Sequence, residues 1–152
     1  MTAGNPPTGA LPPWQRRTIY GTAIAVWLTG VIWLIFKYFI TSTDQFGFTS
    51  PHPQQRIWLI LHAAASLLAT WLFGLLWHHH IARGWESRQR RSSGGTLFGV
   101  ILWLALTGFA LYYIGSDSAR SLISLAHWIV GLAALPAFLL HNRRRDGRIS
   151  YL

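Results

Sequence analysis

The chain has 152 residues, of which 51% are hydrophobic and only 11% are charged, with 13 Lys and Arg residues against 4 Asp and Glu residues. Soluble globular domains carry about 25% charged residues, so this composition excludes an ordinary soluble domain and indicates a membrane protein. The net charge of +9 would suggest nucleic-acid binding only if the basic residues lay on a polar domain. The absence of cysteine excludes disulfides, zinc-thiolate sites and iron–sulfur clusters.

Four apolar stretches follow a proline-rich start. Residues 1–17 contain four prolines and are predicted to be a disordered tail. Each apolar stretch is close to the ~20 residues that a helix needs to cross the hydrocarbon layer. The predicted fold is therefore all-α, a transmembrane four-helix bundle over 18–142, followed by a basic tail at 143–152. The expected helices lie at about 18–40, 57–81, 96–114 and 121–141.

The basic residues lie mainly at one end of this predicted bundle. Ten of the 13 Lys and Arg residues occur in the N-terminal tail, in the loop after the second helix and in the C-terminal tail. Because loops rich in Lys and Arg stay in the cytoplasm, both termini are predicted to be cytoplasmic. Proton-coupled transporters normally carry carboxylates in their spans, and here all four acids lie in loops or tails: Asp44, Glu86, Asp117 and Asp146.

Histidines recur at matching depths in the second and fourth predicted helices. His127 and His141 are 14 residues apart, so they share one face of a supercoiled helix at a separation of roughly 21 Å. His62 lies near the outer end of the second helix, as His127 does in the fourth. The histidine run at 78–80 lies near the inner end, as His141 does. The histidines are therefore expected to pair by depth, one pair outside and one inside.

The inner partner of His141 is ambiguous. Counting from His62, a straight helix brings His80 back to the same face, whereas in a supercoiled helix His79 and His80 fall to either side of that face. We favour His80, then His79, because His80 completes a continuous helical face that starts at His62. His78 points away in both cases.

Two neutral imidazoles that face each other can supply both axial ligands of a haem iron. Since the chain has no cysteine and no methionine after Met1, histidine is the main axial ligand available. We therefore predict two b-type haems. Their iron ligands would be His62 and His127 for the outer haem, and His141 with His80 or His79 for the inner haem.

A structural interpretation competes with ligation at every histidine. A single histidine near a membrane interface is usually structural or solvating, and we expect this role for His52 in the Pro-His-Pro loop and for at least one member of the run at 78–80. Ionisable residues inside a span are by default functional, which favours ligation for His62 and His127. One haem, or none, is the alternative to two.

These residues resemble the membrane cytochrome b subunits of nickel-iron hydrogenases and formate dehydrogenases, within the bacterial cytochrome b561-like group. The resemblance rests on the spacing of His127 and His141, on His62, and on the segment Leu106-Thr-Gly-Phe-Ala-Leu-Tyr112. It covers about residues 18–142.

The chain departs from that family in its first helix. In the family the inner haem often takes a ligand from helix 1, which contains no histidine here. His79 or His80 would have to substitute, which is closer to the larger cytochrome b of respiratory bc complexes.

The resemblance implies electron transfer in the bacterial cytoplasmic (inner) membrane, between a periplasmic or membrane-attached redox enzyme subunit and quinone. Two stacked haems would divide the roughly 30 Å hydrocarbon layer into shorter electron jumps. Such a subunit need not be catalytic alone. Its expected partners are membrane lipid, quinone and the redox subunit, and not nucleic acid, because topology explains the arginines. The main alternative is a non-redox assembly or accessory subunit of a larger membrane complex.

Overall fold

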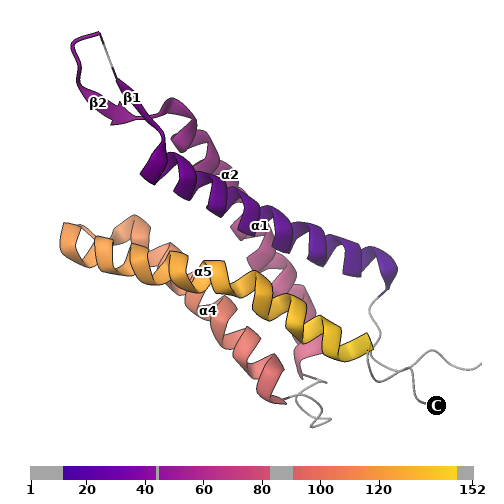
Figure 1. Cartoon of the computed structure of the whole chain (residues 1–152). Helices are drawn as coiled ribbons and strands as arrows, with labels where there is room; N and C mark the ends of the chain where they lie inside the picture. The colour runs from indigo at the N-terminus through magenta and orange to yellow at the C-terminus, as the bar shows by residue number, and fades with distance from the viewer. Residues whose placement is uncertain (1–11, 44, 83–90, 147–152) are drawn as a thin grey trace, which may run out of the picture.

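The computed structural model describes residues 12–43, 45–82 and 91–146, and four long helices make up most of it (Figure 1). By length and composition all four could cross a membrane, and the structure confirms the predicted all-α fold with four long apolar helices. Their bounds are α1 Pro13–Phe39, α2 Pro53–Leu76, α4 Arg91–Tyr113 and α5 Asp117–Asp146.

The helices begin four or five residues before the apolar stretches that predicted them. In α1 and α2 the reason is a proline at the start, Pro13 and Pro53. Proline suits the first helical position because its missing N–H would have no partner there. Residues 13–17 therefore belong to α1 and not to a disordered tail, and residues 1–11 lie outside the described residues. Likewise, α5 extends into the predicted basic tail as far as Asp146.

The predicted helix at 57–81 is divided in two. After α2, the backbone continues as a π-helix, η1, over Trp77–Ala82, which contains the histidine run at 78–80. A π-helix has more residues per turn than an α-helix, so the α-helical phase used to compare His79 with His80 does not extend through this segment. The choice between the two therefore stays a prediction.

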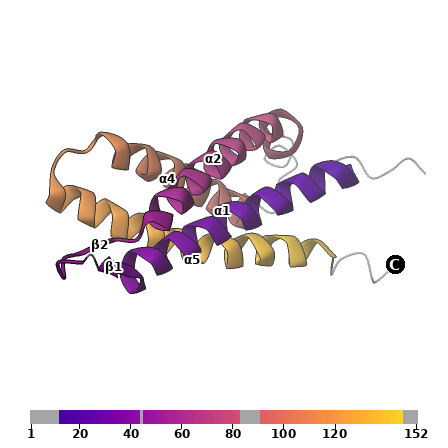
Figure 2. The ribbon, with the colours of Figure 1, turned by 90° about the horizontal axis from the view of Figure 1, so that it is seen from above.

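A short antiparallel β-hairpin connects α1 to α2 and was not predicted. Strand β1, Thr41–Thr43, pairs with β2, Thr49–Pro51, with Thr41 opposite Pro51. The turn contains Gly47 at a φ of 83°, a conformation that glycine adopts without steric cost. Figures 1 and 2 show the hairpin at one end of the bundle, opposite the end at which α1 begins and α5 finishes.

The four helices form two antiparallel hairpins, α1 with α2 and α4 with α5, which meet where α1 packs on α5. The indole N–H of Trp27 in α1 donates to the carbonyl oxygen of Leu132 in α5 at 3.3 Å. Nearer the start of α1, the rings of Tyr20 and Phe138 lie 5.2 Å apart. These two contacts fix the antiparallel register of α1 against α5, and Figure 2 shows the two hairpins from above.

Side-chain burial is inverted with respect to a water-soluble bundle. Among the described residues no hydrophobic side chain is fully enclosed, and the buried side chains are Thr22 and Thr107. Large apolar residues such as Leu67, Trp71 and Leu106 are mostly exposed. Polar groups inside and apolar groups outside are what a hydrocarbon environment favours.

Candidate functional site

Two histidines from different hairpins face each other within the bundle. His62 lies on α2 and His127 on α5, with ring centroids 6.4 Å apart and ring planes at 88°. Both side chains are half-buried. The structure therefore brings together the two residues that the sequence placed at the same outer depth.

The ring of His62 is anchored to α1 through one nitrogen. Its Nδ1 lies 2.9 Å from the carbonyl oxygen of Val26 and 3.3 Å from the hydroxyl oxygen of Thr29. A carbonyl oxygen can only accept a hydrogen bond, so Nδ1 must carry the proton. In a neutral imidazole the other nitrogen, Nε2, then has a free lone pair.

The ring of His127 is anchored to α4 in the same way. Its Nδ1 lies 2.8 Å from the hydroxyl oxygen of Thr107. That hydroxyl donates its single proton to the carbonyl oxygen of Trp103, at 2.7 Å, so it accepts from His127. Nδ1 is again the donor, and Nε2 of His127 is also the nitrogen with a free lone pair.

A glycine follows each anchoring threonine and leaves room for the histidine ring. A Cβ atom at Gly30 would lie 3.0 Å from Cε1 of His62, and one at Gly108 would lie 3.3 Å from Cε1 of His127. We call these two arrangements the Thr-Gly/His units: Thr29-Gly30 with His62, and Thr107-Gly108 with His127. Each unit takes its Thr-Gly pair from the first helix of a hairpin and its histidine from the second.

From the sequence, Thr107-Gly108 entered only as part of the segment that carries the resemblance, and Thr29-Gly30 was missed, although a signal exists. The tripeptide Leu-Thr-Gly occurs at 28–30 and again at 106–108. Each copy precedes a helix that carries a histidine within an apolar stretch. A repeat of three residues is too short to identify a site by itself. The structure adds the packing of the helices, which places each Thr-Gly pair beside a histidine ring.

His141 lies 14 residues after His127 on α5, and its surroundings resemble those of His127. Its Nδ1 lies 3.2 Å from the hydroxyl oxygen of Ser93, and a Cβ atom at Gly94 would lie 4.0 Å from its Cε1. Ser93-Gly94 precedes Thr107-Gly108 by 14 residues, and His141 follows His127 by the same number. The antiparallel hairpin therefore repeats a hydroxyl, glycine and histidine arrangement at two depths.

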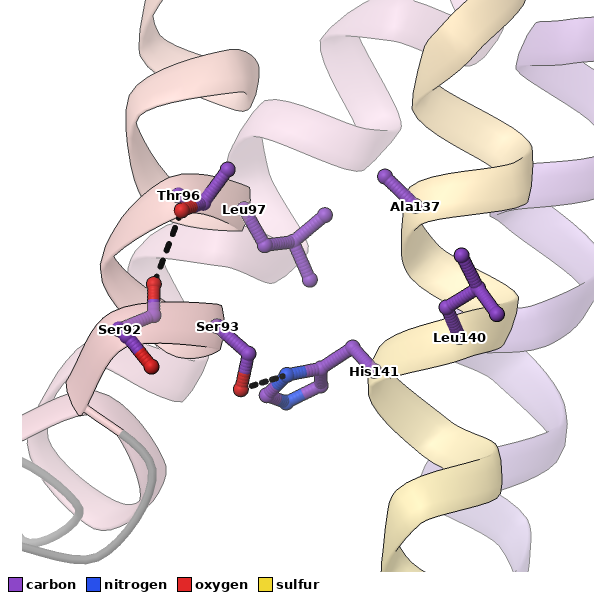
Figure 3. Close-up of a pocket in the computed structure, with 7 residues that line it drawn as sticks. All are labelled: Ser92, Ser93, Thr96, Leu97, Ala137, Leu140 and His141. Atoms are coloured by element: carbon purple, nitrogen blue, oxygen red, sulfur yellow. Dashed lines mark hydrogen bonds between the residues drawn. The ribbon is translucent and has the colours of Figure 1, made fainter.

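A pocket of about 300 Å³ opens beside His141. Figure 3 shows the imidazole pointing from α5 toward α4, with the Ser93 hydroxyl at its edge. The other lining residues are Ser92, Thr96, Leu97, Ala137 and Leu140.

The remaining histidines have separate positions. His79 and His80 lie on η1, but their side chains are outside the described residues, so the inner pairing with His141 stays a prediction. His52 caps α2, because its Nδ1 accepts from the backbone N–H of Gln54 at 3.2 Å. Its ring also lies 5.3 Å from that of Phe36. These contacts agree with the structural role expected for His52.

The donor set at the outer pair consists of two imidazole nitrogens. Among the described residues, no group of three or more His, Cys, Asp or Glu side chains gathers as a metal site. Two ligands suit an iron whose other four ligands come from a porphyrin. The ring centroids of His62 and His127 lie 6.4 Å apart, so this level of the bundle would supply one imidazole ligand from each helical hairpin.

Comparison with known proteins adds no further constraint. No family model, no curated protein and no solved structure matches the chain.

Proposed function

We propose that this chain is a membrane b-type cytochrome that carries electrons across the bilayer through two bis-histidine haems. The observation that carries the proposal is the pair formed by His62 and His127, in which both Nδ1 atoms are engaged with neighbouring helices. Both Nε2 atoms are thereby kept as ligands. This pair would hold the outer haem.

The hydrogen bonds at Nδ1 support ligation in a second way. Metal-bound histidines almost always donate their other ring N–H to a carbonyl, carboxylate or water, which fixes the tautomer and raises the basicity of the ligand. His62 donates to Val26 and His127 donates to Thr107. A haem iron bound here would pass one electron at a time between its ferric and ferrous states.

The inner haem would use His141 together with His80 or His79. Supporting this, the Ser93 hydroxyl lies beside Nδ1 of His141 and Gly94 lies beside its ring. Thr107 and Gly108 lie in the same way beside His127. The 14-residue spacing separates the two levels by roughly 21 Å along α5, so two haems would shorten each electron jump across the membrane.

The proposed setting is the cytoplasmic membrane of a bacterium, with both termini in the cytoplasm. The four membrane-length helices and the basic residues at one end support a multi-pass orientation of this kind. The proposed partners are quinone and a periplasmic or membrane-attached redox enzyme subunit. The chain would act as an electron-transfer subunit and would not be catalytic alone.

Histidine substitutions test the outer site. We expect His62→Ala and His127→Ala each to lower the haem-to-protein ratio of the purified full chain by about one, because each removes one of only two protein ligands. His52→Ala is the matched control, since His52 caps a helix outside the pair. It should leave the haem content unchanged.

The same measurement separates this proposal from its alternative. If neither His62→Ala nor His127→Ala changes the haem content of a coloured protein, the outer ligand assignment is wrong. A colourless wild-type preparation that co-purifies with a larger enzyme would instead favour a non-redox assembly or accessory subunit.

A further inference from the structure

Two indole N–H groups are buried in the bundle without an acceptor. The Nε1 atoms of Trp33 and Trp128 are shielded from solvent, and neither has a hydrogen-bond partner within the described part of the chain. An unpaired buried donor costs about 1–3 kcal/mol, so native proteins rarely retain one without a reason. Trp27, in contrast, donates its indole N–H to Leu132.

Both unpaired indoles lie at the level of the outer histidine pair. Trp33 is one helical turn beyond Thr29, on the same face of α1, and Trp128 directly follows His127 on α5. The contact between Trp27 and Leu132 gives a common reference level for α1 and α5. Toward the β-hairpin end, Trp33 lies six residues beyond Trp27 on α1, and Trp128 lies four residues before Leu132 on α5. At 1.5 Å per residue, their depths differ by only about 3 Å. The two donors therefore belong to one layer, shared with His62 and His127.

A positive charge lies next to this layer. The Nζ atom of Lys37 lies 4.8 Å from the ring centre of Trp33, and Lys37 follows Trp33 by one helical turn. Lys37 forms no ion pair with any acid among the described residues. Asp117 and Asp146, the two acids within the described residues, lie at the two ends of α5. Trp33 and Lys37 thus offer an indole N–H and an ammonium group, one helical turn apart on α1. The hydroxyl of Thr29, one turn before Trp33, already donates to the carbonyl oxygen of Ala25 at 2.7 Å.

We propose that Trp33 and Trp128, together with Lys37, bind the carboxylate edge of the haem held by His62 and His127. This inference rests on the proposed function. Haem carries two carboxylates on one edge of its ring, and a carboxylate accepts strong, charge-assisted hydrogen bonds. Such an edge would satisfy both indole N–H groups and neutralise the ammonium group of Lys37, in the half of the bundle that contains the β-hairpin.

The test compares haem with haem dimethyl ester, in which both carboxylates are blocked. The full-length apoprotein in detergent is titrated with each compound, and the ratio of the two affinities is measured. We expect the wild type to prefer haem by about tenfold or more, because hydrogen bonds to charged groups are the stronger ones. In Trp33→Phe and Trp128→Phe the preference should fall severalfold, since phenylalanine keeps an aromatic ring but has no N–H.

Trp27→Phe is the matched control. It also removes an indole N–H in the α1–α5 interface, but one that donates to Leu132, so it should leave the preference for haem over the ester unchanged. Equal affinity of the wild type for both compounds would overturn the inference. So would an unchanged preference in both Trp33→Phe and Trp128→Phe. In each of these cases haem still binds, so the proposed function stands; a wild type that binds neither compound would refute both.

Discussion

At the scale of single residues, the glycines opposite the histidine rings set the space available to those rings. In Gly108→Ala the new methyl group would lie 3.3 Å from Cε1 of His127, which is tighter than ordinary van der Waals contact. We expect the ring to shift and the haem-to-protein ratio to fall, with a larger loss for Gly30→Ala, where the distance to His62 is 3.0 Å.

Gly99 offers the control for this prediction on the same helix, because a Cβ atom there meets nothing within 4 Å. Gly99→Ala should keep the full haem content. Equal haem content in Gly108→Ala and Gly99→Ala would show that the close approach to His127 has no functional meaning.

Thr107 is expected to set the redox potential of the outer haem. Its hydroxyl accepts from Nδ1 of His127, which raises the basicity of the ligand and favours the ferric state. Thr107→Val removes the acceptor and should raise the midpoint potential by roughly 20–60 mV. This range corresponds to a net hydrogen-bond contribution of about 0.5–1.5 kcal/mol at 59 mV per tenfold change for one electron.

Potentiometric titration of the haem absorbance measures this shift. Thr107→Ser should restore the wild-type potential, since it keeps the hydroxyl. Thr70→Val is the control, because the Thr70 hydroxyl bonds to the carbonyl oxygen of Ser66 within α2. A midpoint potential that is the same in Thr107→Val and wild type would contradict the assignment.

The histidines could be singled out from the sequence, whereas their anchors could not. An ionisable side chain inside an apolar span is conspicuous by itself, as His62 and His127 are. A threonine in a span is not, since its hydroxyl can bond to its own helix, as Thr70 does. Only the packing of α4 on α5 distinguishes Thr107 from such a residue.

At the scale of elements, hydropathy located the four spans but not their ends. Apolar runs indicate where a helix is suited to cross a membrane, but α1 and α2 begin at Pro13 and Pro53, outside the apolar runs. The π-helical segment Trp77–Ala82 also escaped prediction, because its residues suit an α-helix equally well. That segment contains the histidine run at 78–80, so an α-helical phase counted from His62 does not extend to His79 and His80.

The register within α5 is expected to control the inner haem separately from the outer one. Inserting one alanine between Ala133 and Ala134 should rotate His141 by about 100° relative to His127. The predicted result is a chain that holds one haem instead of two, with the outer haem retained. The measurement is the haem-to-protein ratio of the purified variant.

An alanine inserted after Phe46 is the control, since that position lies in the turn of the β-hairpin outside the spans. It should leave two haems per chain. Two haems in the α5 insertion variant as well would mean that His141 is not an iron ligand.

At the scale of the whole molecule, the start of α1 and the end of α5 lie at one end of the bundle, and the β-hairpin and the α4–α5 connection lie at the other (Figure 1). Charge then predicts the orientation, with the basic end in the cytoplasm. Since the chain has no cysteine, single cysteines can report it directly. In intact cells, a membrane-impermeant maleimide should label Ser50→Cys and Ser116→Cys, which are exposed at the end that is predicted to face outward, but not Gln15→Cys at the start of α1.

Labelling of Gln15→Cys without labelling of the other two would show that the orientation is opposite to the predicted one. The proposed outer and inner haems would then exchange sides. Permeabilised cells provide the control, because all three cysteines should then react.

The central claim is that the bundle is a dihaem b-type cytochrome, and the absorption spectrum of the purified full-length chain tests it most directly. Dithionite reduction should produce the bands of a low-spin b-type haem, with two haems per chain by quantitative extraction. Absence of reduced b-type bands from a folded preparation made under haem-replete conditions would contradict the claim.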